Sequence, residues 1–385
     1  PDPRLDARHV PCWGHEGNGV SPHWLAAAAL IREQDPELAK AFAWAWNEQG
    51  RPMEAHHDAG FSPRLVMHAD LLDGLPKEYV PKQLQSTWLP GFGAVLRAHA
   101  GDPQETYLSY RQGYLTSHCD ANQGDFVIYA KGAPLSVMSL FGYAIHDNRP
   151  YAKLCEEFGW HNRVRFGEQS DTGGWPGGGK RSQVHAHHVS PEVDYLRGEG
   201  LYGPQLWTRQ LLFLKGKRAE GPNYFVLRDS FHNPEDDPTK LQRKWWYLRT
   251  PGEKQCVSTT AAGLTFQSPF GPRLLARLLA PAQARFESRE ATQEGPMYFQ
   301  AARNWRRAGS AIVQDRNETN ITIKETTTVT AAGPIDPRQD VLVLLYPQGD
   351  GESEPKYECL ADGVAKITTS EGTDYVFLGR EPLAY

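Results

Sequence analysis

The stretch that decides the fold is residues 91–111, GFGAVLRAHAGDPQETYLSYR. It holds two short runs rich in β-branched and aromatic residues, 94–97 and 106–111, separated by a turn of Gly, Asp and Pro. Runs of this length between such turn residues are typical of β-strands. The periodicity of the sequence therefore changes to that of strands at Gly91.

The same pattern recurs along most of the chain that follows. Further runs lie at 125–130, 209–214, 224–228, 244–249, 321–329, 341–346 and 374–378. No helical segment alternates with them, so we expect a large antiparallel β-sandwich. The 36 Gly and 29 Pro among 385 residues suit a turn-rich β protein, and 11 Trp add the flat aromatic surfaces common where sugars bind.

The residues before Gly91 carry helix signals instead. Two runs begin with a capping residue followed by Pro, at Ser21 and Asp35, and Gly50 ends the second. The run 36–49 has large apolar residues on more than one face, which predicts burial against further helices. We therefore interpret residues 1–90 as the end of a larger helical array.

Composition disfavours two classes of partner. The chain has 41 basic and 46 acidic residues and no basic run of the kind that follows a phosphate backbone, so nucleic acid is a poor candidate. The longest apolar stretches, 25–31 and 341–346, are far below the ~20 residues of a membrane-spanning helix, so we expect a soluble protein without a membrane partner.

The cysteines and the first residue bear on processing. The five Cys are scattered without CxxC spacing, which indicates neither a zinc ribbon nor a dense disulfide framework. Because the chain starts at Pro1 with no signal-like segment behind it, we expect a chain processed or cut from a longer precursor, with any export signal lying outside it.

Residues able to do chemistry gather where predicted strands meet loops. In the stretch SHCDANQG at 117–124, His118, Asp120 and Asn122 share one face of an extended chain. His161 belongs to a second such group. A mixed set of His and Asp is compatible with a zinc or calcium site, although this spacing is not diagnostic.

Each candidate also has a purely structural explanation. His118 and His161 could be half-buried histidines bonded to backbone carbonyls. The histidines within 185–188 are expected in a solvated strand or loop. Tyr143 and Tyr151 could be core or rim aromatics of the sandwich.

Several short motifs, in order and spacing, resemble the C-terminal region of heparinase II/III-like polysaccharide lyases. They are GFGAVLR at 91–97, SHCDANQ at 117–123, FVIYAKGAP at 126–134 and HNRV at 161–164. The strand stretches at Asp194, 209–214 and 224–229 are also similar to that family, and the resemblance runs from about residue 11 to residue 374.

The resemblance implies an α+β fold in which an (α/α) toroid precedes an antiparallel β-sandwich. Residues 1–90 would be the last helices of the toroid, 91–333 the large sandwich, and 334–385 a small C-terminal β module. The implied reaction is β-elimination at a uronic acid within an acidic polysaccharide of the alginate or glycosaminoglycan type. The resemblance also implies a secreted or periplasmic enzyme whose remaining, N-terminal half is missing here or is a separate chain.

The catalytic roles follow from that reaction, which needs a neutralised C5 carboxylate, a base for the C5 proton and an acid for the leaving oxygen. His118 falls on the family's first motif His, near the substrate, and is the predicted carboxylate neutraliser. Tyr151 is the predicted proton donor or acceptor on the sandwich side, with Tyr143 as its alternative.

The resemblance also bears on metal and substrate binding. His161 falls on a family metal ligand, and Asp120 replaces the family's second His, so these two form the predicted residual metal or structural pair. The metal would be divalent, zinc or calcium, and no organic cofactor is expected. Asn122, Arg111 and Trp160 are the predicted substrate-binding residues.

Two other functions stay open. A carbohydrate-binding or structural protein would keep the fold without the chemistry, and the changed ligand positions favour it. A glycoside hydrolase would need two carboxylates across a cleft. Asp120 and Asp125 lie on the same short segment without a convincing partner, so we rank that function last.

Overall fold

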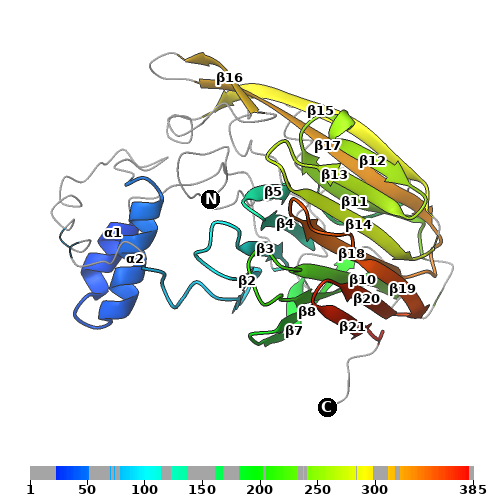
Figure 1. Ribbon diagram of the computed structural model, residues 1–385, viewed down its shortest axis with the longest axis horizontal. Helices are drawn as coiled ribbons and strands as arrows, with labels where there is room; N and C mark the ends of the chain where they lie inside the picture. The colour runs from blue at the N-terminus through cyan, green and yellow to red at the C-terminus, as the bar shows by residue number, and fades with distance from the viewer. Residues whose placement is uncertain are drawn as a thin grey trace.

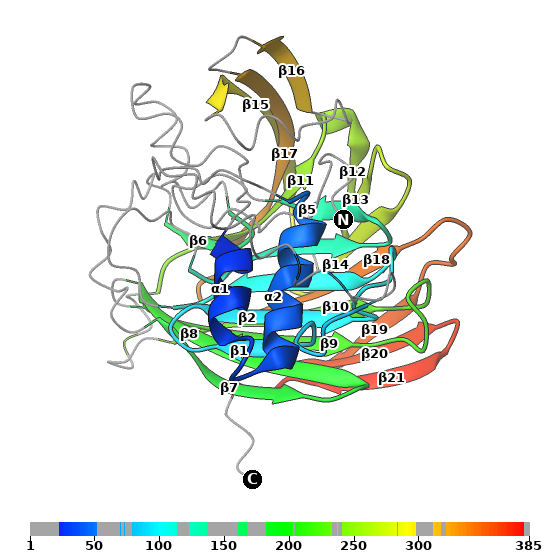
Figure 2. The ribbon, with the colours of Figure 1, turned by 90° about the vertical axis from the view of Figure 1, so that its left-hand side faces the viewer.

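The computed structural model describes residues 23–51, 70, 73, 79–113, 123–137, 161–167, 182–202, 205–232, 237, 241–282, 284–297, 311–316 and 321–380. Two helices, α1 (His23–Ile31) and α2 (Pro36–Glu48), lie side by side on one side of a body of β-sheets (Figures 1 and 2). The strand-rich body confirms the predicted sandwich. A toroid is not visible in the described residues.

The start of α2 forms as its sequence predicts. The Asp35 carboxylate accepts a hydrogen bond from the Leu38 backbone N at 2.9 Å, and Pro36 occupies the first turn. The two helices pack through a cluster that includes Ala28, Ala39 and Ala43. Neither described helix is long and apolar enough to cross a membrane.

A five-stranded sheet, here called the meander sheet, contains the stretch quoted at the outset. Its strands follow sequence order: β1 (Thr87–Leu89), β2 (Gly93–Ala98), β3 (Thr106–Arg111), β4 (Asp125–Ala130) and β5 (Ala133–Ser136). The β4–β5 turn places both Lys131 (φ 56°) and Gly132 (φ 78°) in the left-handed region. This is the backbone of a type I′ hairpin turn, which matches the twist of the paired strands.

An eight-stranded sheet, the central sheet, forms the middle of the body. Its strands in spatial order are β12 (Val257–Thr260), β13 (Gly263–Gln267), β14 (Arg273–Ala280), β18 (Val341–Gln348), β10 (Tyr224–His232), β9 (Gln205–Leu214), β8 (Val193–Tyr202) and β7 (Gln183–Val189). A short 3₁₀ helix, Lys254–Cys256, leads into β12.

Two further sheets complete the body. The arm sheet, whose long strands extend to the top of Figure 1, contains β15 (Phe286–Met297), β17 (Ile321–Ile335), β11 (Lys244–Pro251) and β6 (Val164–Phe166), with β16 (Ala311–Arg316) paired to β17. The C-terminal sheet contains β19 (Lys356–Ala361), β20 (Val364–Thr369) and β21 (Gly372–Phe377). All described strand pairs are antiparallel, as predicted.

The middle of the central sheet is buried on both faces. In β18 the odd-numbered residues Val341, Val343 and Leu345 join the main core with side chains of the meander and arm sheets. The even-numbered residues Leu342, Leu344 and Tyr346 join a second core against the C-terminal sheet. This explains why the run VLVLLY is apolar throughout, because a strand covered on both sides needs no polar face.

Two element boundaries differ from those expected. The first strand starts at Thr87, before Gly91, because residues 87–89 pair with residues 93–95 across the turn. The part predicted as a separate module from residue 334 begins with β18, which lies inside the central sheet. Only β19 to β21 form a sheet of their own, because an apolar strand such as β18 must be covered on both faces.

A lysine is buried where β11 begins. Lys244 has no exposed surface, its Nζ donates to the Pro337 carbonyl at 2.7 Å, and the same atom lies 3.8 Å from the Phe231 ring centre. Burial lowers the pKa of Lys244 to about 7, and the nearby Asp340 carboxylate only partly opposes that effect.

The first prediction concerns this lysine. With a folded-state pKa near 7, Lys244 binds more protons in the unfolded chain than in the folded one between pH 7 and the usual lysine pKa, so its contribution to stability rises with pH in that window. Urea unfolding of the wild type and Lys244→Met at pH 7 and pH 9 should show the wild type gaining about 1 kcal/mol per pH unit over the variant. If the free energy of unfolding changed equally with pH in both proteins, the result would contradict a buried Lys244 with a lowered pKa.

Candidate functional site

The candidate site lies where β4 begins and where the chain enters β6. Asp125 is the first residue of β4, and His161 precedes β6 by three residues. The His161 Nδ1 lies 2.7 Å from the Asp125 Oδ2, with the side chains 4% and 0% exposed. A carboxylate on one ring nitrogen fixes the orientation of the imidazole and directs the other nitrogen, Nε2, away from it.

Asn162 extends this pair into a joint between two sheets. Its backbone N donates to the Asp125 Oδ1 at 2.8 Å, and its side-chain Nδ2 donates to the Phe126 carbonyl at 2.6 Å. Its Oδ1 accepts from the backbone N of Arg249, in β11, at 2.6 Å. One buried amide therefore bonds the meander sheet and the arm sheet, and it holds His161 beside Asp125.

A buried ion pair in the central sheet supports the same segments. Arg209, in β9, donates from Nε and Nη2 to the two carboxylate oxygens of Asp229, in β10, at 2.7 and 2.8 Å. Its Nη1 donates to the carbonyls of Gly124 at 2.5 Å and Asn162 at 2.9 Å. The guanidinium thus fixes the backbone on both sides of the Asp125–His161 pair.

This ion pair is charged although it is fully buried. Burial by itself would lower the pKa of the Arg209 guanidinium, but the charge and hydrogen bonds of Asp229 raise the pKa overall. The Trp207 indole Nε1 also donates to the Asp229 Oδ1 at 2.8 Å. Bidentate Arg–carboxylate geometry with further bonds is the arrangement that makes a buried pair tolerable.

We call the residues Asp125, His161, Asn162, Arg209 and Asp229 the buried network. Chemically, it presents one oriented imidazole backed by a carboxylate, which suits a proton-transfer group or a metal ligand. The other members of the buried network hold His161 and the neighbouring backbone in place. Among the described residues, no group of three or more His, Cys, Asp or Glu is placed to hold a metal ion.

Arg111 is the other predicted site residue that the structure describes. It is 8% exposed, its Nη1 donates to the Phe92 carbonyl at 2.5 Å, and its guanidinium lies 4.7 Å from the Phe92 ring centre. These contacts hold the β1–β2 turn. Contact between Arg111 and substrate stays a prediction.

The remaining predicted residues lie outside the described part of the chain. They are His118, Asp120, Asn122, Tyr143, Tyr151 and Trp160. The role of His118 and the metal pair of Asp120 and His161 therefore stay predictions.

Three positioning residues carry a signal that sequence reasoning did not use. Arg209 and Asp229 are charged residues within apolar strand runs, and such residues need a buried partner. Asp125 likewise starts a strand that is buried along almost its whole length. Their pairing depends on which strands become neighbours, so it becomes visible only in the folded chain.

Comparison with known proteins bears on the fold. No family model and no curated protein sequence matches the chain. Heparan sulfate lyase HepC from Pedobacter heparinus matches in structure with a TM-score of 0.61 and 12% identity, over 99% of this chain and 52% of that chain. Two heparinase III structures match with TM-scores of 0.56 and 0.53 and identities of 13% and 11%, over 97% and 98% of this chain and 50% and 52% of theirs.

These matches show that the chain has a heparinase-like fold, as its motifs led us to expect. The strand-rich body corresponds to the C-terminal β-sandwich of the heparinases. The chain spans about half the length of the solved structures that it matches.

The second prediction tests the support of the site. Arg209→Met removes the partner of a fully buried carboxylate, so it should lower the free energy of unfolding by about 3–5 kcal/mol. Arg285→Met is the matched control, because Arg285 is 80% exposed, and its change should stay within about 0.5 kcal/mol. Urea unfolding measures both. A loss for Arg209→Met no larger than that of the control would contradict the role of the ion pair.

Proposed function

We propose that the chain is the sandwich-bearing portion of a polysaccharide lyase that cleaves a uronic-acid-containing acidic polysaccharide by β-elimination. The observation that carries this proposal is the match to heparan sulfate lyase and heparinase III structures over nearly the whole of this chain. The oriented imidazole of His161 adds a residue suited to the chemistry.

The proposed reaction divides its tasks among few groups. His118 neutralises the C5 carboxylate, so that the C5 proton becomes acidic enough to remove. Tyr151, or Tyr143 in its place, transfers a proton. The buried network contributes position, because Arg209 and Asp125 fix the backbone at residues 124–126, directly after the segment that carries His118.

A divalent ion is compatible with His161. His161 would hold zinc or calcium together with Asp120, and the Asp125 carboxylate on its ring is the partner found in carboxylate–histidine–metal sites. A bound ion would supply positive charge beside the uronate carboxylate. The elimination transfers protons and no net electrons, so the proposal includes no organic cofactor.

The proposed partner is an acidic polysaccharide, and the proposed place of action is the periplasm or the cell exterior. We further propose that the rest of the toroid comes from a longer form of this chain or from a separate chain. Both proposals rest on the heparan sulfate lyase match, in which this chain covers about half of the other.

The test is incubation of the protein with alginate, heparan sulfate and other uronic-acid polysaccharides while ultraviolet absorbance follows the unsaturated product. Rising absorbance with an acidic substrate, and none with a neutral one, supports the lyase. Binding without product would favour the second candidate, a non-catalytic carbohydrate-binding protein of the same fold. The partial coverage of the lyase structures is the observation that favours this second candidate.

The third prediction addresses the catalytic residues in an active preparation. His118→Ala should lower turnover by about 10²–10³-fold and change glycan binding little, because a group that stabilises developing charge acts mainly in the transition state. Tyr151→Phe should also lose turnover while its ring remains. His188→Ala, a change on the exposed edge strand β7, is the control and should keep full activity. Full activity of both His118→Ala and Tyr151→Phe would refute these assignments.

A further inference from the structure

We propose that the meeting point of β1 and β7 is a second saccharide-binding site, which takes an anionic sugar unit of a glycan chain. β1 is the edge strand of the meander sheet, and β7 is the edge strand of the central sheet. A pocket and an exposed aromatic pair lie together at this junction. None of the residues of the buried network lines this pocket.

The aromatic pair consists of Trp88 from β1 and His187 from β7. Their ring centres are 4.8 Å apart, with an angle of 25° between the planes, so the rings are stacked. Trp88 is 38% exposed, although tryptophan is highly buried on average. A tryptophan held flat at the surface offers an apolar face together with an N–H donor, which suits a sugar ring with its C–H face and hydroxyls.

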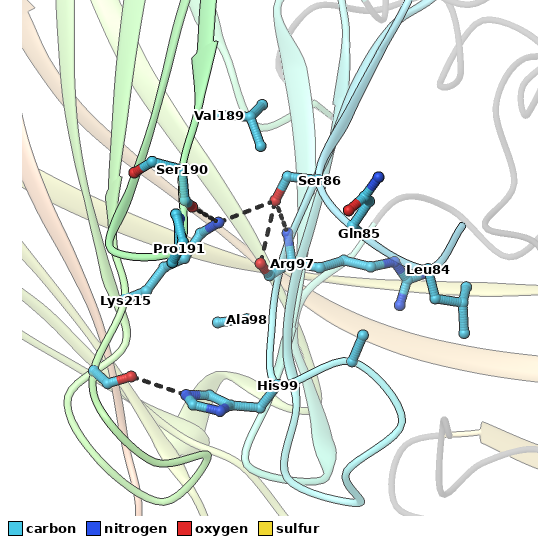
Figure 3. A pocket seen from close by; sticks show the side chains of 12 residues that line it. Leu84, Gln85, Ser86, Arg97, Ala98, His99, Val189, Ser190, Pro191 and Lys215 are labelled. Atoms are coloured by element: carbon cyan, nitrogen blue, oxygen red, sulfur yellow. Dashed lines mark hydrogen bonds between the residues drawn. The ribbon is translucent and has the colours of Figure 1, made fainter. Parts of the chain in front are cut away.

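The pocket adjoins this pair along both strands. It has a volume of about 440 Å³, within the range of small-ligand sites, and Figure 3 shows several of its lining side chains. Ser86 lines it two residues before Trp88, and Val189 lines it two residues after His187. The pocket and the stacked rings are therefore neighbours along both strands.

The lining of the pocket is cationic. Arg97 and Lys215 line it, and no Asp or Glu is among its described lining residues. Each cation has a carboxylate partner that does not itself line the pocket. The Lys215 Nζ is 2.6 Å from the Oδ1 of the fully buried Asp194, whose Oδ2 accepts from the lining Ser86 Oγ, and the Arg97 Nη1 is 3.2 Å from the Glu105 Oε2. The charge that faces the pocket therefore complements an anion.

The two cations have different roles. The Lys215 Nζ also donates to the Ser190 carbonyl at 2.8 Å and to the Ser86 Oγ at 3.4 Å, so it braces the wall, as the dashed lines of Figure 3 show. Arg97 donates to Glu105 through one nitrogen, and its guanidinium lies 4.5 Å from the Tyr107 ring centre. A guanidinium has five N–H donors in a planar fork, more than these contacts use. Arg97 is thus the group that would bind a carboxylate or sulfate.

This combination selects the ligand class. The stacked rings suit a sugar ring, and the cationic wall favours a uronate or sulfated unit over a neutral sugar. The identification of the glycan as acidic also rests on the proposed function. A second site of this kind would hold the polymer on the protein between cleavage events and raise its effective concentration.

The fourth prediction tests this site at the residue that defines it. The indole N–H signal of Trp88 is assigned in the NMR spectrum of the full chain by its loss in Trp88→Phe. Titration with alginate or heparan sulfate tetrasaccharide should shift this signal in a saturable way, whereas cellotetraose should not. Arg97→Gln should weaken the binding about tenfold, since one charge-assisted contact is worth about that factor.

Leu89→Ala is the matched control, because Leu89 is 39% exposed and adjacent to Trp88 but does not line the pocket. It should leave the titration unchanged. An unmoved Trp88 signal, an equal shift with cellotetraose, or equal binding by Arg97→Gln would each overturn the proposal. Lyase product without a Trp88 shift would refute this site alone, and a Trp88 shift without product would refute the lyase alone.

Discussion

The arrangement of the sheets depends on the cost of burying carboxylates. Asp125 and Asp229 have no exposed surface, and a buried carboxylate is tolerated only when its oxygens are paired. Asp229 receives Arg209, and Asp125 receives His161 and the backbone of Asn162. Together with the bonds from Arg209 to the Gly124 carbonyl and from the Arg249 amide to Asn162, these bonds join β4, β9, β10 and β11, which belong to three different sheets. Satisfying two charges therefore fixes how the meander, central and arm sheets meet, and it sets the orientation of His161.

The extent to which the fold could be predicted follows from the burial of each strand. The runs with one or two apolar faces, such as 106–111 and 341–346, all form strands. They do so because an apolar face is buried when the strand packs within a sheet. β7 and β19 are almost entirely exposed, and in their sequences, QVHAHHV and KYECLA, the alternation of polar and apolar residues that marks a half-buried strand breaks off after a few positions. Sheet order, which places β18 between β14 and β10, depends on contacts between residues far apart in sequence.

The candidate site was predictable only in part. The motif HNRV drew attention to His161, but nothing in the local sequence connects it to Asp125. The strand stretches that resemble the lyase family contain charged residues that form ion pairs in the folded chain. Arg209 pairs with Asp229, and Asp194 pairs with Lys215. The resemblance of these strand stretches to the lyases therefore reflects ion pairs inside the sandwich. It bears on the fold more directly than on the catalytic chemistry.

Native-state hydrogen exchange gives the most direct test of the buried network as the joint of the structure. The amides of Asn162 and Arg249 donate to the side chains of Asp125 and Asn162, so they report these bonds individually. The account predicts that both amides exchange only through global unfolding, with the same free energy of opening as the Leu344 amide in β18. Exchange of either amide through local opening, several kcal/mol easier than that of Leu344, would contradict it.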